Sequence, residues 1–128
     1  MVDESIEGLP RRVRRAAELL AEEIAAIIVS ELLDPRIRFT TVTRVVPSGD
    51  LRSARVYLSV YADETARRQT LRAVEHARGY IQSLLSQRLR MKFTPRLFFV
   101  LDHSVEHSDR VSRILRELSA EESAGDAV

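Results

Sequence analysis

A glycine interrupts the longest helical pattern of this 128-residue chain. Apolar residues recur at helical spacing from Glu64 to about Arg90, and Gly79 lies within that stretch. A glycine inside a helix costs about 1 kcal/mol relative to alanine, so we expect it to serve a purpose. Three explanations stay open: close packing on a neighbouring layer, a kink between two helices, or access of a ligand to the backbone.

The first half of the chain alternates between helical and strand periodicity. Apolar spacing predicts a helix of about 20 residues from Pro10 to Asp34-Pro35, because the residue before a proline is pushed out of the α region. The stretch 39–46 is rich in β-branched residues, which predicts a strand. The stretch 51–62 alternates between apolar and polar positions, so the two are predicted to form an antiparallel hairpin.

The second half completes a two-layer pattern. Asp63 is expected to cap the helix that begins at Glu64. Pro95 opens a third strand, RLFFVLD, whose nearly all-apolar character predicts burial on both faces. Ser104 is expected to cap a last helix. An α+β domain follows, with helices packed on a three-stranded mixed sheet.

The predicted order is α-β-β-α-α-β plus a C-terminal helix, within one domain at residues 10–118. Residues 1–9 are expected to form a disordered lead. Residues 119–128 are small and acidic, and are expected to form a disordered tail.

Several classes of protein fit the composition poorly. The chain has no cysteine, so neither a disulfide framework nor a thiolate site is possible. No apolar run approaches the roughly 18 residues that span a bilayer, and the acidic N-terminus is unlike a secretory signal, so a cytoplasmic protein is expected. His103 and His107 are four residues apart, but without an HExxH pattern a helix cap is favoured over a metal site. No catalytic constellation or cofactor motif is present, so neither an enzyme nor a cofactor is expected.

Charge is distributed unevenly although the net charge is only +1. Residues 63–100 carry eight basic and three acidic side chains, whereas residues 101–128 carry three and seven. Lys92 is the only lysine among the 20 basic residues. Arginine suits bidentate recognition of phosphate, but a GC-rich genome produces the same bias, and both explanations stay open.

A helix break at Gly79 would create a candidate phosphate site. If a second helix begins there, its first backbone N–H groups have no intrahelical partner and, together with the helix dipole, attract an anion. Arg72 and Arg78 lie nearby in the sequence and could add positive charge. A purely structural kink stays open as the alternative.

These features together resemble a known family. The α-β-β-α-α-β order is that of the type II KH RNA-binding module, in which a GXXG loop usually joins the paired helices. This chain has Ala77-Arg78-Gly79 instead, and an Ala-x-Gly kink at that place resembles the bacterial ribosome-binding factor A family. The supporting stretches are Asp34-Pro35-Arg36, Phe39-Thr40-Thr41-Val42-Thr43, Asp50-Leu51-Arg52, Ala54-Arg55-Val56-Tyr57, Arg88-Leu89-Arg90, Thr94-Pro95 and Phe99-Val100-Leu101-Asp102. The resemblance covers about Arg12 to Leu118.

The resemblance implies a function and a set of partners. Members of that family are cytosolic, non-enzymatic factors that bind the small (30S) ribosomal subunit, assist late maturation of its 16S rRNA and are linked to cold adaptation. It therefore implies a monomer whose partners are the subunit and its rRNA, with no membrane and no small-molecule substrate. A protein–protein interaction or dimerisation module of the same α+β shape stays open as the alternative.

The resemblance marks only the break as the RNA-facing site, whereas the other candidates rest on charge and placement. The full set of expected RNA-binding residues is Arg72, Ala77, Arg78, Gly79, Arg88, Arg90, Lys92, Arg36 and Arg38. For each arginine, a solvated helix face or loop is the alternative. Aromatic residues make up only 5% of the chain, so base stacking is expected to be minor and recognition of a shaped RNA surface is favoured.

Overall fold

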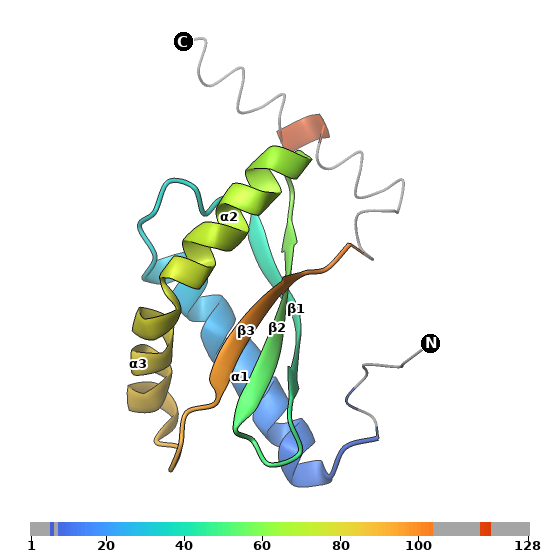
Figure 1. The fold of residues 1–128 in the computed structure, drawn as a ribbon, viewed down its shortest axis with the longest axis vertical. Helices are drawn as coiled ribbons and strands as arrows, with labels where there is room; N and C mark the ends of the chain where they lie inside the picture. Colours follow the sequence, from blue (N-terminus) through green and yellow to red (C-terminus); the bar gives the residue numbers. More distant parts are fainter. Residues whose placement is uncertain (1–5, 7, 104–115, 119–128) are drawn as a thin grey trace.

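The computed structural model describes residues 6, 8–103 and 116–118. Its elements are α1 (Arg11–Ser30), β1 (Thr40–Pro47), β2 (Ser53–Val60), α2 (Glu64–His76), α3 (Arg78–Leu89) and β3 (Arg96–Leu101), as Figure 1 shows. The predicted α-β-β-α-α-β order is therefore confirmed. Residues 116–118 are helical, but the expected cap at Ser104, the acidic tail and most of the lead lie outside the described residues.

The sheet is mixed and has the order β1-β2-β3. β1 and β2 pair antiparallel, which confirms the predicted hairpin, and β2 and β3 pair in parallel. The parallel pair requires a long crossover connection, which α2 and α3 provide. A β-bulge between Val42 and Arg44 shifts the register of β1 against β2.

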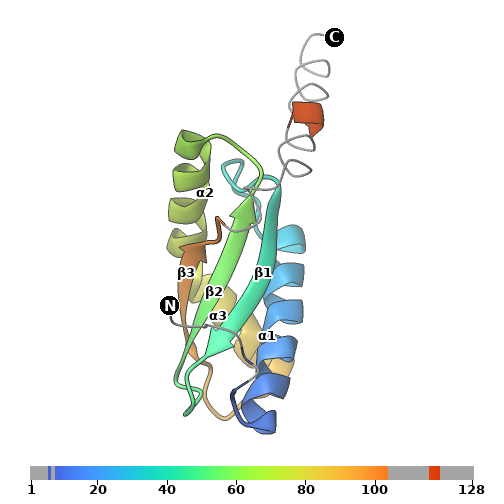
Figure 2. The same ribbon diagram turned by 90° about the vertical axis from the view of Figure 1, so that its right-hand side faces the viewer.

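Among the residues that the structure describes, helices cover one face of this sheet, and none covers the other face. In Figure 2 the strands lie in front of α1, α2 and α3. The core lies between these layers, and its fully buried members include Leu20 and Ile24 of α1, Leu58 of β2, Ile81 of α3 and Leu97 of β3. The buried residues of α1 recur at helical spacing and therefore form one apolar stripe along the helix. This stripe faces the sheet. We call the helix-covered side the inner face and the opposite side the outer face.

Two sequence predictions need correction. α1 ends at Ser30 rather than at Asp34-Pro35, and the Ser30 hydroxyl donates to the Ala26 carbonyl at 2.7 Å. Such a bond competes with the backbone ladder near the helix end. β3 is not buried on both faces: Phe99 is 6% exposed, but Phe98 is 41% exposed. The reason is that successive side chains of a strand point to opposite faces, and no described helix covers the outer one.

The helical connection begins as predicted. Asp63 precedes α2, and its carboxylate accepts a hydrogen bond from the Ala66 N–H at 2.8 Å. This is the geometry of an N-terminal helix cap. None of the described helices is long and apolar enough to cross a membrane.

Candidate nucleic-acid interface

A single residue, Ala77, separates α2 from α3. Its φ of −86° and ψ of 4° lie outside the helical region. Its N–H is shared between the carbonyls of Ala73 and Val74, both at 3.1 Å, and its own carbonyl accepts from the Ile81 N–H at 2.9 Å. The shared bond tightens the last turn of α2, and a new helix starts one residue later. The predicted kink is therefore confirmed, and its centre is Ala77.

Gly79 lies in the first turn of α3, and nothing packs against it. A Cβ added there would meet no atom within 4 Å, and the residue is exposed. Its φ is not positive, so the backbone does not require glycine either. Close packing on the sheet is therefore excluded as the purpose of this glycine. What the missing side chain leaves is unobstructed access to the backbone of the first turn.

The start of α3 is electrostatically suited to an anion. The first N–H groups of a helix lack intrahelical acceptors and lie at the positive end of its dipole. The first turn of α3 contains no acidic residue, and His76 ends α2 just before the break. Arg72 is exposed on α2, one turn before His76, and forms no ion pair within the described part of the chain. The break therefore combines exposed backbone donors with a free cation.

Arg78 points from the break toward the sheet. Its guanidinium carbon lies 5.8 Å from the ring centroid of Phe98 on β3. The residue is half-buried, and its Nε is buried without a hydrogen-bond partner among the described residues. Burying an unpaired donor costs free energy, so this placement calls for an explanation.

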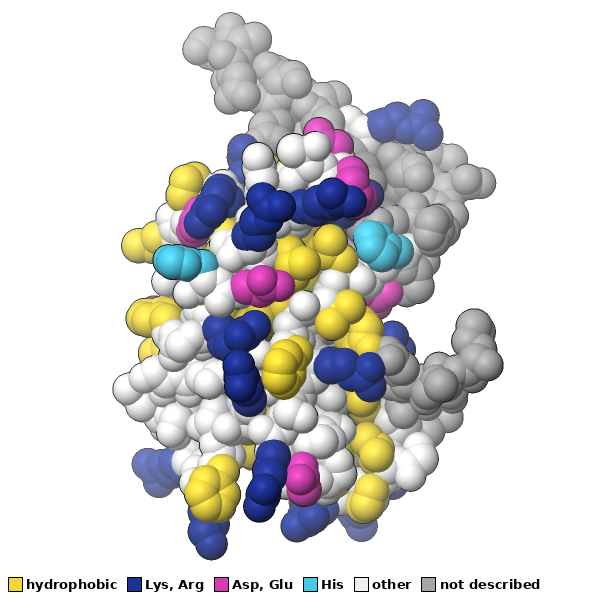
Figure 3. All heavy atoms as spheres, in the orientation of Figure 1, with side chains coloured by type: hydrophobic (Ala, Val, Ile, Leu, Met, Phe, Trp, Pro, Cys, Tyr) yellow, Lys and Arg dark blue, Asp and Glu magenta, His cyan; other side chains and the backbone are white. Residues whose placement is uncertain are grey.

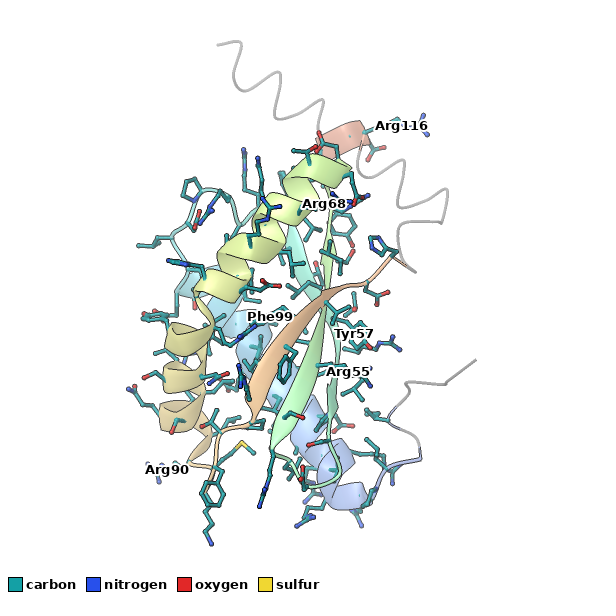
Figure 4. The ribbon with its side chains drawn as sticks, in the orientation of Figure 1. Arg55, Tyr57, Arg68, Arg90, Phe99 and Arg116 are labelled. Atoms are coloured by element: carbon teal, nitrogen blue, oxygen red, sulfur yellow. The ribbon has the colours of Figure 1, made fainter. Side chains whose placement is uncertain are left out.

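Two of the predicted cations lie at the other end of α3. Arg90 caps that end in the left-handed conformation, with φ 50° and ψ 37°, and is exposed. Lys92 is also exposed, and its Nζ lies 5.7 Å from the ring centroid of Phe93. Because α3 has 12 residues, about 18 Å of helix separates this pair from the break. Figure 4 labels Arg90 at this far end. The structure thus separates Arg90 and Lys92 from the predicted residues at the break.

Arg88 is occupied by contacts with α1. Its guanidinium lies 3.1 Å from a carboxylate oxygen of Glu31 and 3.6 Å from one of Glu23. These ion pairs join α3 to α1 and to Glu31, the residue that follows α1. A phosphate would have to compete with two carboxylates for this side chain, so Arg88 fits a structural role better than an RNA contact.

Arg36 is held by its own loop. The Asp34 carboxylate accepts from the Arg36 Nη2 at 2.7 Å and from its Nε at 3.1 Å. Hydrogen bonds from the Arg36 side chain and backbone lower the pKa of Asp34 from 3.8 to about 2. The Arg36 carbonyl accepts from the Thr70 hydroxyl at 2.6 Å, which fastens the loop to α2. Arg38 is exposed nearby, with its guanidinium carbon 5.7 Å from the Phe39 ring centroid.

The outer face of the sheet carries positive charge that was not among the predicted site residues. The three strands contain three arginines, Arg44, Arg55 and Arg96, and no acidic residue. The pairing register places all three on the outer face, and all are exposed. The alternation of 51–62 had already separated Arg55 from the apolar side. Alternate residues of a strand lie on the same face, and this rule applied to the other two strands would have identified Arg44 and Arg96 as well. Figure 3 shows Lys and Arg side chains among hydrophobic ones on this side of the molecule.

The described part of the chain offers no alternative metal site. No group of three or more His, Cys, Asp or Glu side chains in it could hold an ion. His107 and Asp109 lie outside the described residues. Asp102 is 8% exposed and accepts a hydrogen bond from the Thr43 hydroxyl at 2.8 Å.

Comparison with known proteins agrees with this arrangement. The family model described as "Ribosome-binding factor A" matches residues 12–115. The chain belongs to the ribosome-binding factor A family. The family's protein from Halothermothrix orenii is 45% identical over 112 residues, which cover 88% of this chain and 92% of the relative. The one from Thermomicrobium roseum is 44% identical over 110 residues, with 86% and 85% covered.

Solved structures of the family share the fold. The crystal structure of ribosome-binding factor A from Thermus thermophilus has a TM-score of 0.65 at 29% identity, covering 72% of this chain and 97% of that one. A solution structure of a Thermotoga maritima protein, a putative ribosome-binding factor A, has a TM-score of 0.66 at 27% identity, covering 77% and 93%. A homology model of the Thermus thermophilus factor, fitted into a cryo-electron microscopy map of its 30S complex, has a TM-score of 0.58 at 31% identity, covering 68% and 91%.

Proposed function

We propose that this protein binds the small ribosomal subunit through 16S rRNA and assists late maturation of that RNA. It acts as a cytoplasmic monomer without catalysis, and its activity matters most for growth in the cold. Membership of the family supports this role, as does the similarity to a factor fitted into a map of its 30S complex. The observation that carries it is the α2–α3 break, where Gly79 leaves the start of α3 open beside Arg72 and Arg78.

The proposed contacts fall into three groups. Backbone N–H groups near Gly79, with Arg72 and Arg78, bind phosphates at the break. Arg90 and Lys92 bind the RNA backbone at the far end of α3. The remaining candidates, Arg36, Arg38 and Arg88, contribute less, because Arg36 and Arg88 already contact carboxylates.

Salt dependence tests the electrostatic basis of this proposal. Each phosphate contact releases condensed counterions, so the association constant falls steeply as salt rises. The protein should sediment with purified small subunits at low salt and separate from them as salt is raised. Co-sedimentation that is absent at low salt would contradict the function.

A charge-reversal variant tests the site itself. Replacing Arg72, Arg78 and Arg90 by glutamate should abolish co-sedimentation while the circular dichroism spectrum stays unchanged. The matched control replaces Arg11, Arg12 and Arg15 by glutamate, which changes net charge equally at exposed positions in the first two turns of α1. Equal loss in both variants would show that only net charge matters.

The protein–protein alternative has one observation in its favour. Val29 and Leu33, near the end of α1, are 79% and 92% exposed, and Val29 lines an open hollow of about 440 Å³. Sedimentation equilibrium without ribosomes distinguishes the two functions. A dimer that the Leu33→Asp substitution converts to a monomer would support the alternative, whereas a wild-type monomer would remove this support for it.

A further inference from the structure

One aromatic ring and two guanidinium groups form a cluster on the outer face of the sheet. Phe98 of β3 is 41% exposed. The guanidinium carbon of Arg96, on the same strand, lies 5.5 Å from its ring centroid, and that of Arg78 lies 5.8 Å from it. Arg78 belongs to α3, so the cluster connects the helix break with the sheet. We call these three residues the Phe98 cluster.

The Phe98 cluster carries positive charge without an internal counter-charge. Neither Arg78 nor Arg96 forms an ion pair within the described part of the chain. The ring attracts each cation, but the two cations repel each other. The half-buried stem of Arg78, with its unpaired Nε, keeps that guanidinium over β3 rather than in solvent. A bound anion would relieve the repulsion.

The surrounding face has the same sign of charge. Arg55 lies opposite Phe98 in the β2–β3 register. Arg44 lies on the same face, and its guanidinium carbon is 4.1 Å from the Tyr57 ring centroid. β1, β2 and β3 contain no acidic residue, and the carboxylate of Asp102, just past β3, is 8% exposed and accepts a hydrogen bond from Thr43. The exposed charge around Phe98 is therefore positive and attracts a polyanion.

We propose that the Phe98 cluster binds an unpaired nucleotide of RNA. The base stacks on the exposed part of the Phe98 ring, and the adjacent phosphates contact Arg78 and Arg96. Every base has a planar face that can stack on an aromatic side chain, and arginines beside it supply backbone contacts. An acidic protein segment would use the cations but not the ring, so the exposed ring favours RNA.

This inference rests on the proposed function and enlarges its site. The RNA interface extends from the break at Ala77, past Arg78 and the edge of β3, onto the outer face. Base stacking is then part of recognition, in contrast to the expectation from the low aromatic content. The ring went unnoticed in the sequence because the apolar run RLFFVLD predicted a strand buried on both faces.

The test compares two exposed phenylalanines in the full-length protein. Phe98→Leu removes the planar ring but keeps an apolar side chain, and Phe98→Tyr keeps the ring. Phe93→Leu is the matched control, because Phe93 is 72% exposed and lies beside a single cation, Lys92. Binding is measured by fluorescence anisotropy with a labelled single-stranded RNA, and by co-sedimentation with small subunits.

Phe98→Leu should weaken binding to the single-stranded RNA about tenfold, whereas Phe98→Tyr and Phe93→Leu should bind like the wild type. The slope of the logarithm of the association constant against the logarithm of the salt concentration should be unchanged in Phe98→Leu, because no charge is lost. Arg96→Gln should reduce that slope by about 0.7, the value for one phosphate contact on a single strand. On irradiation, RNA that contains 4-thiouridine should crosslink to Phe98 or its neighbours on β3.

Each remaining outcome overturns the inference in a recognisable way. Equal binding of single-stranded RNA by Phe98→Leu and Phe93→Leu would show that the ring does not stack. If Phe98→Leu lost binding to subunits but kept binding to single-stranded RNA, the outer face would contact a ribosomal protein instead. In both cases the wild type still binds subunits, so the proposed function stands. A wild type that binds no subunits would remove both proposals together.

Discussion

Phe98 and Phe99 are neighbours in β3, yet they belong to two different surfaces. Phe99 is 6% exposed and packs in the core beneath the helices, whereas Phe98 is 41% exposed on the outer face. Figure 4 labels Phe99 beside β3, on the side toward α2 and α3. One residue type therefore serves two purposes, and the pleat of the strand decides which one.

The difference extends to the whole sheet. The inner face of β2 presents Ala54, Val56 and Leu58, all at most 1% exposed, to the helices. Its outer face, together with those of β1 and β3, carries every arginine of the three strands. Apolar burial stabilises the fold through the inner face. The outer face is exposed around Arg55 and Phe98, so substitutions there should leave the fold intact, as a binding surface requires. Further along β2 the same face is buried, because Tyr57 and Ser59 are only 6% and 0% exposed.

The largest effect on stability is expected when the buried and the exposed phenylalanine of β3 are each replaced by alanine. Phe99→Ala should lower the free energy of unfolding by about 3 kcal/mol, because it removes a buried ring and leaves a cavity. Phe98→Ala should cost less than about 1 kcal/mol, since its ring is already partly solvated. Urea denaturation of both variants measures the difference. Similar losses for the two would show that the outer face is part of the core.

A smaller effect of opposite sign is expected at the break. Gly79→Ala should raise the free energy of unfolding by about 0.5–1 kcal/mol, because the added Cβ meets no atom within 4 Å and the φ is not positive. The same substitution should weaken binding to small subunits. Thermal denaturation and co-sedimentation on one sample test both parts. A variant that is more stable and binds equally well would leave the glycine without a functional explanation.

The order of elements could be predicted because local patterns determine it. Helical spacing, β-branched runs and the cap at Asp63 each act within a few residues. Burial could not be predicted in the same way. RLFFVLD is apolar at nearly every position, and only the side on which α2 and α3 pack distinguishes Phe98 from Phe99. The end of α1 was misplaced because Leu32 continues the apolar spacing, although it packs against the core from beyond the helix.

The candidate site was predictable at its centre but not at its edges. Ala77-Arg78-Gly79 is a contiguous motif, so its residues lie together in the fold because they are adjacent in the chain. Arg88 looked equivalent to Arg90 in the sequence, because the partners of Arg88 lie on α1 and just beyond its end, more than fifty residues away in the chain. A charge cannot be assigned to solvent or to an ion pair until such long-range neighbours are known.

Removing the ion pairs between Arg88 and the α1 region should have a modest effect. Arg88→Gln should lower the free energy of unfolding by about 0.5 kcal/mol, because half-exposed ion pairs contribute little. Subunit binding should change less than in Arg90→Gln, whose side chain has no carboxylate partner in the described part of the chain. Chemical denaturation and co-sedimentation of the two variants compare stability and binding. If Arg88→Gln impairs binding more strongly, the ion pairs do not prevent it from contacting RNA.

The smallest expected effect concerns the loop at Asp34. The pKa of Asp34 is lowered from 3.8 to about 2, so the folded state favours the ionised carboxylate more than the unfolded state does. Its contribution to stability is complete above about pH 4 and is lost as pH falls toward 2. Asp34→Asn should therefore lower the melting temperature slightly at pH 7, and the gap from wild type should close in acid. Melting curves from pH 7 to pH 2 measure this gap. A gap that stays constant would mean that Arg36 is held by the backbone of the loop rather than by the Asp34 charge.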